Sequence, residues 1–284
     1  IESPCLNCSD TPCMHFDDSK QLKKVFDVAL SLEVCPTNSI SLDEKKQVVI
    51  DDKTCINCGL CAFRCKTGAI YASDDKMRVS RDITMLTAGK QQYRDIKIIK
   101  NNNLFDGIEQ KLGLLIEVIK NHKTSSVVRN NLFKSYFMSL GFKVAKPRTG
   151  DVNLRMDFVL ESGDTLFLVE SAQIGSPDTI RDVLDGVAIL SHKYEISLGE
   201  LAGACCLLEF PNKRSDFYEL VSDVKNVLNV DIYTLSLGVI MSILNNDSIL
   251  DITAFSVNEN QKSCRKALEK ALGEECDFSL NSSF

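Results

Sequence analysis

Apolar and polar positions alternate with helical periodicity in the second half of the chain. The clearest segment is 176–193, where Ser176 is suited to cap a helix and Pro177 to stand in its first turn. One face of the expected helix carries Ile180, Val183, Leu184, Val187 and Leu190. This segment therefore predicts an amphipathic helix that packs on a core.

Two further helices are expected earlier in the chain, over residues 104–121 and 125–140. Either Ser125 or Ser126 is placed to cap the second helix, and Gly141 follows its end. Both helices are basic. Such a surface faces either the phosphates of a nucleic acid or simply solvent.

Short apolar runs between the helical segments predict strands. Residues 153–160 and 165–170 are expected to form a hairpin around a turn that contains Gly163. The later segments predict, in order, a buried strand at 203–210, a helix at 214–229, a strand or strand plus helix at 230–244 and an amphipathic helix at 260–273. This order predicts an α/β domain with a mixed sheet flanked by helices.

In the first part of the chain, the regular feature is the spacing of the cysteines. Eight of the twelve cysteines lie between Cys5 and Cys65, at short spacings that favour metal over disulfides. One run has the spacing C-x2-C-x2-C-x3-C and consists of Cys55, Cys58, Cys61 and Cys65. A second, interrupted run consists of Cys5, Cys8, Cys13 and Cys35. The remaining cysteines, expected to be reduced structural thiols, are Cys205, Cys206, Cys264 and Cys276.

About twenty extra residues precede Cys35 in the interrupted run. Within them Val25, Ala29 and Leu32 recur at helical spacing. The insertion therefore predicts a short helix that returns the chain to Cys35.

The cysteine runs resemble those of the two-cluster bacterial ferredoxins, in which the last cysteine of each run ligates the other cluster. The paired segments CPTNSI and CKTGAI strengthen this resemblance. It implies two 4Fe-4S clusters, one held by Cys5, Cys8, Cys13 and Cys65 and the other by Cys55, Cys58, Cys61 and Cys35. The sequence departs from the family in the C-x4-C spacing after Cys8, in the insertion before Cys35 and in Lys66, where proline is usual.

Zinc is the competing interpretation, because C-x2-C pairs also build tetrahedral thiolate sites. A tight C-x2-C-x2-C loop suits a cubane better. We therefore expect an α+β ferredoxin-like iron-sulfur domain over residues 1–88, a linker over 89–103 and the α/β domain over 104–284.

The order of elements in the α/β domain is similar to the restriction-endonuclease-like fold and its PD-(D/E)xK site. That resemblance implies metal-binding acids at Asp157 and Glu170, with Gln173 as the next polar group. A hairpin register that pairs Glu161 with Asp164 would make the two acids diagonal neighbours, able to share a divalent metal such as Mg²⁺. Ala172 stands where the family has its lysine, so an active and a degenerate nuclease are both open.

A structural interpretation of these acids also stands, in which Asp157 and Glu170 only pair with Arg155 on a face of the sheet. The leading hypothesis is a ferredoxin-like module, electron-carrying or redox-sensing, fused to a nucleic-acid-binding, nuclease-like domain. The alternative is an electron-transfer subunit that docks on a larger oxidoreductase through its C-terminal domain.

The distribution of charged residues favours a different hypothesis in each part of the chain. Residues 90–150 carry 12 basic and 4 acidic residues, which favours phosphate contact, whereas residues 151–284 carry 10 basic and 22 acidic residues, which favours protein docking. No apolar run approaches the length of a membrane span and no glycine-rich phosphate loop is present in the sequence. We therefore expect a cytoplasmic protein whose partner is a redox protein or a nucleic acid, with no membrane partner.

Overall fold

The computed structural model describes residues 5–23, 25–26, 28–73, 76–81, 108–148, 150, 153–256 and 262–273. The chain divides into two compact units. The N-terminal unit comprises Ile1–Asp18 and Leu32–Ser135, and the C-terminal unit comprises Ser19–Ser31 and Tyr136–Phe284. The predicted linker at 89–103 lies outside the described residues, so its position stays a prediction.

The N-terminal unit is built from two small hairpins. Its described elements are β2 (Ile40–Leu42), β3 (Val48–Ile50), α1 (Leu60–Arg64), β4 (Ile70–Ser73), β5 (Lys76–Val79), α3 (Ile108–Asn121) and the first part of α4 (Ser125–Ser139). Strands β2 and β3 pair antiparallel, and so do β4 and β5. Each hairpin directly follows one of the paired cysteine segments, so the duplication expected from the sequence is a duplication of structure.

The C-terminal unit is organised around one mixed sheet, with strand order β1-β6-β7-β8-β9-β10. Its strands are β1 (Val28–Ala29), β6 (Lys143–Pro147), β7 (Phe158–Ser162), β8 (Thr165–Ile174), β9 (Leu201–Glu209) and β10 (Ile232–Ser236). The first four strands pair antiparallel, whereas β8, β9 and β10 are parallel. The predicted mixed sheet is confirmed.

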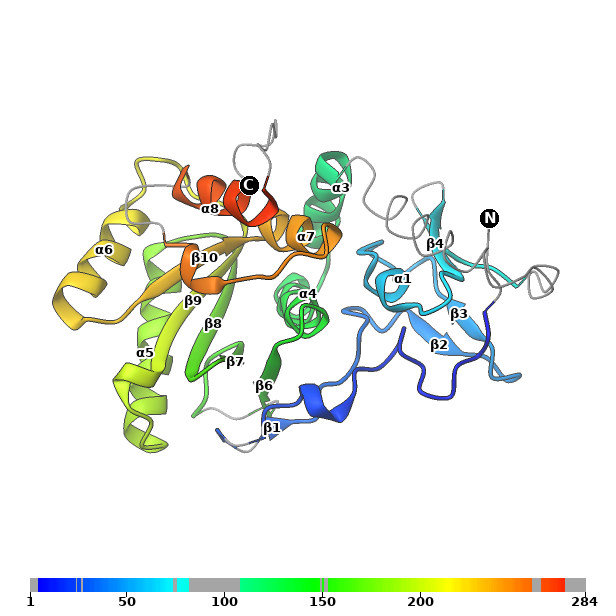
Figure 1. Cartoon of the computed structure of the whole chain (residues 1–284), viewed down its shortest axis with the longest axis horizontal. Helices are drawn as coiled ribbons and strands as arrows, with labels where there is room; N and C mark the ends of the chain where they lie inside the picture. The colour runs from blue at the N-terminus through cyan, green and yellow to red at the C-terminus, as the bar shows by residue number, and fades with distance from the viewer. Residues whose placement is uncertain are drawn as a thin grey trace. The chain divides into compact units, whose positions relative to one another are not determined.

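Helices cover both faces of this sheet (Figure 1). They are α5 (Pro177–Lys193), α6 (Asp216–Leu228), α7 (Leu237–Asn245) and α8 (Lys262–Leu272), with short 3-10 turns at Asp18–Lys20, Leu198–Glu200 and Ile252–Ala254. Because α5 and α6 each connect neighbouring parallel strands, right-handed crossovers place both on the same side. Helix α7 packs on β9 and β10 from the other side.

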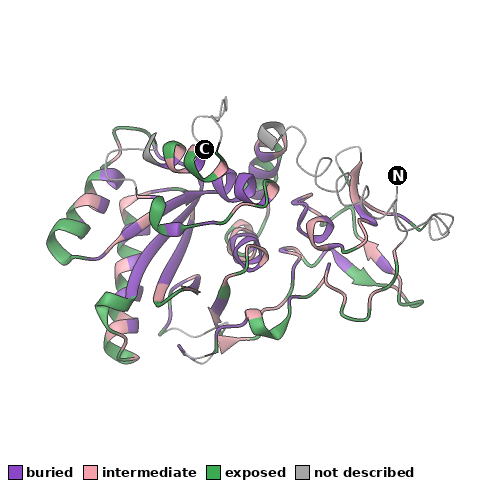
Figure 2. Cartoon of the chain, viewed as in Figure 1, coloured by how far each residue is buried: buried purple, intermediate pink, exposed green. Residues whose placement is uncertain are grey.

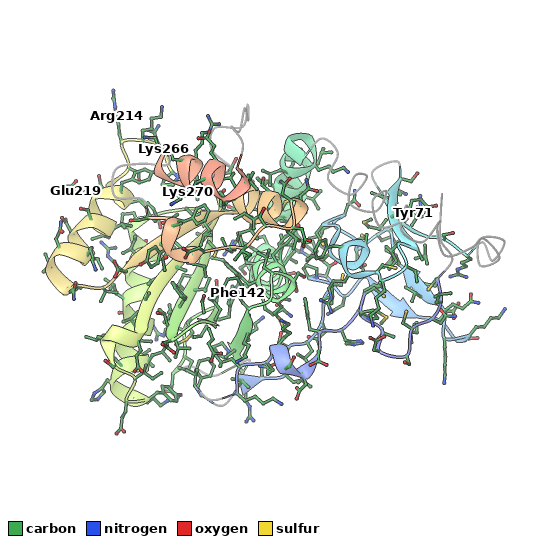
Figure 3. All side chains as sticks on the ribbon, in the orientation of Figure 1. Tyr71, Phe142, Arg214, Glu219, Lys266 and Lys270 are labelled. Atoms are coloured by element: carbon green, nitrogen blue, oxygen red, sulfur yellow. The ribbon has the colours of Figure 1, made fainter. Side chains whose placement is uncertain are left out.

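The core lies between these layers, and Figure 2 shows the central strands as buried. Eight of the nine residues of β9 are buried, which explains why its sequence is a continuous apolar run without alternation. Beside the sheet, the ring centroids of Phe137 and Phe158 lie 6.0 Å apart, and Phe137 meets Phe142 edge-on at 5.6 Å. Phe142, labelled in Figure 3, lies between α4 and β6. Aromatic side chains thus join the end of α4 to the sheet.

Local signals predicted α5 correctly. Ser176 caps the helix and forms a capping box with Thr179, while Ile180, Val183, Val187 and Leu190 are buried. Helix α4 ends as expected before Gly141, which has a φ of 104°.

The helix predicted in the insertion before Cys35 is wrong. Its described residues contain a 3-10 turn and then β1, whose Val28 lies opposite Pro147 of β6. Gln21 fixes the segment further, since its side-chain amide lies 3.4 Å from the carbonyl oxygens of Ala29 and Val144. Pairing with a distant strand has overridden the helical pattern.

The hairpin of β7 and β8 forms where predicted, but its register differs by two residues. Glu161 lies opposite Leu166, and Ser162 lies opposite Thr165. The turn is therefore Gly163–Asp164, and Gly163 adopts a φ of 60° that suits a tight hairpin.

Helix α4 is not the exposed basic surface that the nucleic-acid hypothesis expected. All its residues from Leu132 to Met138 are buried, including Lys134, which is 2% exposed. In the part of the chain that the structure describes, no helix is both long and apolar enough to span a membrane.

The close packing of α5 on β8 gives a stability prediction. A Cβ added at Gly186 would overlap the Leu168 side chain, so Gly186→Ala should lower the free energy of unfolding by about 1 to 3 kcal/mol. The matched control is Asp185→Ala, an exposed position on the same helix, which should change it by less than about 0.5 kcal/mol. Urea unfolding followed by circular dichroism measures both, and equal effects would contradict the packing described.

Candidate metal centres

Two Cys-x-Asn-Cys turns open the cysteine runs. In each, the asparagine lies in the left-handed region of the backbone, with a φ of 48° at Asn7 and 57° at Asn57. Asparagine tolerates this conformation better than most residues. The repeat was readable in the sequence as CLNC and CINC and indicates that the two runs share one local structure.

The paired segments that end the runs also match each other. The Cys35 Sγ lies 3.6 Å from the hydroxyl of Thr37, and the Cys65 Sγ lies 3.5 Å from that of Thr67. A backbone amide three residues after each cysteine donates to the carbonyl of that cysteine. The two segments therefore present their thiols in the same way.

The eight cysteines gather around two separate cavities. The first cavity has a volume of about 400 Å³ and is lined by Cys5, Cys8, Cys13 and Cys65. The second cavity is much smaller, about 10 Å³, and is lined by Cys35, Cys55, Cys58 and Cys61. Each cavity thus takes three thiols from one run and the last thiol from the other, the same division that the ferredoxin resemblance implies.

The thiols lie in largely apolar surroundings. Burial, together with the nearby Cys65, raises the pKa of the Cys13 thiol to about 12. Burial is also the main cause that raises the pKa of Cys55, Cys58 and Cys61. Sulfur ligands bind iron as thiolates, so metal binding at these positions must release protons. Four sulfur donors around each cavity fit a 4Fe-4S cluster, which is held by four cysteine thiolates.

Two cations beside Cys65 hold the irregular first run in place. The Arg64 Nε donates to the Pro12 carbonyl at 2.7 Å, and a second guanidinium nitrogen donates to the His15 carbonyl at 3.3 Å. The guanidinium also lies 4.2 Å from the ring centroid of Phe16. Burial lowers the pKa of Arg64, but the group stays charged because its ordinary pKa is above 12.

Lys66 also binds the first run, through an ion pair with Asp10. We call the contacts of Arg64 and Lys66 with the first run the clamp. The pair lowers the pKa of Asp10 and raises that of Lys66, since each charge stabilises the other. Asp10 belongs to the C-x4-C spacing and Lys66 replaces the usual proline. Two departures from the family pattern are thus in contact with each other, which the sequence showed only as two separate anomalies.

The segment that carries Cys35 is held by α4. The Lys134 ammonium donates to the Glu33 carbonyl at 2.8 Å and the Ser135 hydroxyl donates to the same oxygen at 3.3 Å. The Asn131 amide donates to the Pro36 carbonyl at 3.4 Å. Sequence reasoning missed this role, because nothing in the local pattern links residues about one hundred positions apart.

The acids expected in the α/β domain do not form a comparable site. The Asp157 carboxylate accepts hydrogen bonds from the backbone amide and the hydroxyl of Ser171, both at 2.8 Å. Glu170 is 8% exposed, and Gln173 on the same strand is half-buried. Among the described residues, no three His, Cys, Asp or Glu side chains converge to hold a single metal ion. The cysteines do not converge on one point either, because they are spread around the two cavities.

The cysteines of the C-terminal unit lie apart from both cavities. Cys205, Cys206 and Cys264 are buried and unbridged, and the Cys264 thiol donates to the Thr234 carbonyl at 3.2 Å. Burial raises the pKa of Cys264 to about 12 and keeps it protonated. Cys276 lies outside the described residues.

Comparison with known proteins supports the interpretation of the first unit. Residues 32–69 match the family described as 4Fe-4S dicluster domain. The N-terminal unit contains a ferredoxin-like iron-sulfur domain. The matched residues include Cys35 and the whole run from Cys55 to Cys65, whereas Cys5, Cys8 and Cys13 precede them.

Two relatives of the chain are also ferredoxin-like by name. Over 66 residues the chain is 34% identical to the polyferredoxin-like subunit of an aliphatic sulfonate oxidoreductase from Pyrococcus furiosus, covering 23% of this chain and 28% of that protein. Over 81 residues it is 31% identical to an uncharacterised ferredoxin of Methanocaldococcus jannaschii, covering 28% of this chain and 39% of that protein. No solved structure gives a significant match.

The division of the thiols predicts the result of single substitutions. Cys13→Ser removes one thiol from the first cavity only, so iron and acid-labile sulfide should each fall from about eight to about four per chain. Cys205→Ser, in the C-terminal sheet, is the control and should leave both at about eight. A complete loss of iron from the Cys13 variant would contradict two independently assembled sites.

The clamp on the first run gives a second prediction. Arg64→Met should leave the thiols in place but speed the loss of the cluster at the first cavity during exposure to a chelator, because Pro12 and His15 lose their donors. The control is Arg181→Met, whose exposed guanidinium pairs with Asp178 in the C-terminal unit. Visible absorbance followed over time measures the rates, and equal rates in both variants would show that Arg64 holds nothing.

Proposed function

We propose that this chain is an electron-transfer subunit whose N-terminal unit carries two 4Fe-4S clusters and passes single electrons to or from a larger oxidoreductase. The proposed ligands are Cys5, Cys8, Cys13 and Cys65 for one cluster and Cys35, Cys55, Cys58 and Cys61 for the other. Such clusters, when bound, supply one-electron redox chemistry without proton or group transfer.

The observation that carries this proposal is the sorting of eight thiols into two sets of four, each around its own cavity. The match of residues 32–69 to the dicluster domain supports it independently of the geometry. So does the relative from Pyrococcus furiosus, which is by name a subunit of an oxidoreductase. That protein extends well beyond the matched part, so its activity and partners enter here only as part of the proposal.

We assign the C-terminal unit the role of attachment to the partner enzyme. The larger part of this unit, residues 151–284, is acidic, with 22 acidic against 10 basic residues, and an acidic surface suits a protein partner better than a phosphate backbone.

The nuclease interpretation has less support. The Asp157 carboxylate is already hydrogen-bonded to Ser171, Ala172 stands at the lysine position, and the most central basic residue of α4 is buried. The comparisons lend no support to a nuclease-like class or to bound Mg²⁺.

An anaerobic redox titration tests the proposal. Protein purified without oxygen should contain about eight irons and take up and release about two electrons per chain reversibly, with the electron spin resonance of two interacting clusters in the reduced form. Iron that cycles irreversibly, or not at all, would leave the clusters as structural elements and contradict electron transfer.

A binding measurement separates the two hypotheses. We expect no nucleic-acid affinity that falls steeply between about 50 and 200 mM salt, the behaviour that phosphate contacts produce. Filter binding with duplex and single-stranded DNA measures it. A steep fall, together with redox-silent clusters, would favour the nucleic-acid hypothesis instead.

A further inference from the structure

The two cysteine cavities differ in the charge of the residues around them. Three lysines line the first cavity together with its cysteines: Lys45, Lys46 and Lys66. Among the residues that line the second cavity no side chain is charged. The lining of the first cavity likewise includes no acidic residue. Of the two cavities, the first alone has charged side chains among the described residues that line it.

A tight turn between β2 and β3 presents two of these lysines. The Asp43 carboxylate accepts the backbone amides of Lys45 at 2.9 Å and Gln47 at 2.8 Å, so its charge is engaged inside the turn. Lys46 has a φ of 58°, and its amide donates to the Asp43 carbonyl at 2.9 Å. These hydrogen bonds fix the turn, and the side chains of Lys45 and Lys46 are exposed, as is that of Glu44 beside them.

Exposed apolar side chains lie in the same cavity lining. Leu6 follows the first cysteine and is 47% exposed, and Leu42 at the end of β2 is 42% exposed. An apolar patch with a charged rim is the usual composition of a protein contact surface. We call the five residues Leu6, Leu42, Lys45, Lys46 and Lys66 the lysine face.

We propose that the lysine face is the surface at which electrons pass to or from the partner, and that the partner presents an acidic patch there, in addition to its attachment at the C-terminal unit. This inference rests on the proposed function and specifies where electrons enter or leave the chain. Lys66 is partly neutralised by Asp10, so Lys45 and Lys46 supply most of the attraction. Opposite charges steer such encounters and mainly raise the association rate, which then falls as salt screens them.

The two cavities then have different roles in electron transfer. A docked partner meets the first cavity across a charged, partly apolar surface, whereas the second cavity is lined by Ile40, Ile50, Ile56, Leu60 and Met77 and by no charged side chain. The charge pattern therefore assigns exchange with the partner to the first cavity.

Small oxidants of opposite charge test this assignment in the protein with both clusters bound. The dithionite-reduced chain is mixed with the anionic cobalt(III) complex of EDTA or with the cationic hexaamminecobalt(III) ion, and reoxidation is followed by stopped-flow absorbance. One electron passes to each cobalt(III), which becomes cobalt(II), and no bond in the protein forms or breaks.

The wild-type chain should react faster with the anion than its charge-reversed variant does, and the rate should fall with rising salt. Lys45→Glu should slow the anion several-fold and speed the cation. Lys53→Glu is the matched control, an exposed lysine in the same unit that lines neither cavity, and should change both rates much less. Lys45→Gln with Lys46→Asn provides a second variant, in which asparagine suits the left-handed backbone at position 46.

Each outcome decides the question. Rates that respond to Lys45 but not to Lys53 support the lysine face. Equal responses at both positions, or none at Lys45, overturn it while leaving electron transfer intact. A protein that dithionite does not reduce overturns both the inference and the proposed function. Iron content near eight per chain must be verified for every variant, so that a lost cluster is not mistaken for a lost encounter.

Discussion

Each cavity needs thiols from two stretches of chain that are distant in sequence, and the N-terminal unit depends on this crossing. Three cysteines arrive on a tight local loop, but the fourth comes from the end of the other run. Neither cavity can be complete until both halves of the duplication have come together. The two hairpins, the short helix α1 and the paired turns at Asn7 and Asn57 position those few sulfur atoms.

The contacts around the cavities extend that constraint to the rest of the unit. Arg64 and Lys66 flank Cys65 and bind the loop of the opposite run. Cys65 therefore lines the cavity while its two neighbours hold the loop beside it. Lys134 does the same for the segment of Cys35 from a helix far along the chain. Positive charge next to sulfur ligands also favours the more negative, reduced form of a bound cluster, so the contacts of Arg64 and Lys66 bear on electron affinity.

How far the sequence predicts this structure depends on how local each signal is. Helix α5 was predictable because Ser176, Pro177 and the apolar face from Ile180 to Leu190 all lie within one segment. The division of the thiols was predictable only through resemblance to a family. The residues before Cys35 were predicted wrongly, since their partner Pro147 is more than one hundred positions away. The register of β7 and β8 failed on one turn residue, because Gly163 takes the first position of the turn and not the second.

The placement of β1 has a consequence for how the two parts of the chain are related. Residues 19–31 belong to the C-terminal sheet although they interrupt the first cysteine run. The chain is therefore not two modules joined end to end: it passes from the first unit to the second, returns to finish the iron-sulfur part, and only then completes the sheet. A fragment that begins after residue 31 would lack β1 and leave that edge of β6 unpaired, open to pairing with another strand. Neither unit is therefore encoded by one continuous stretch of the sequence.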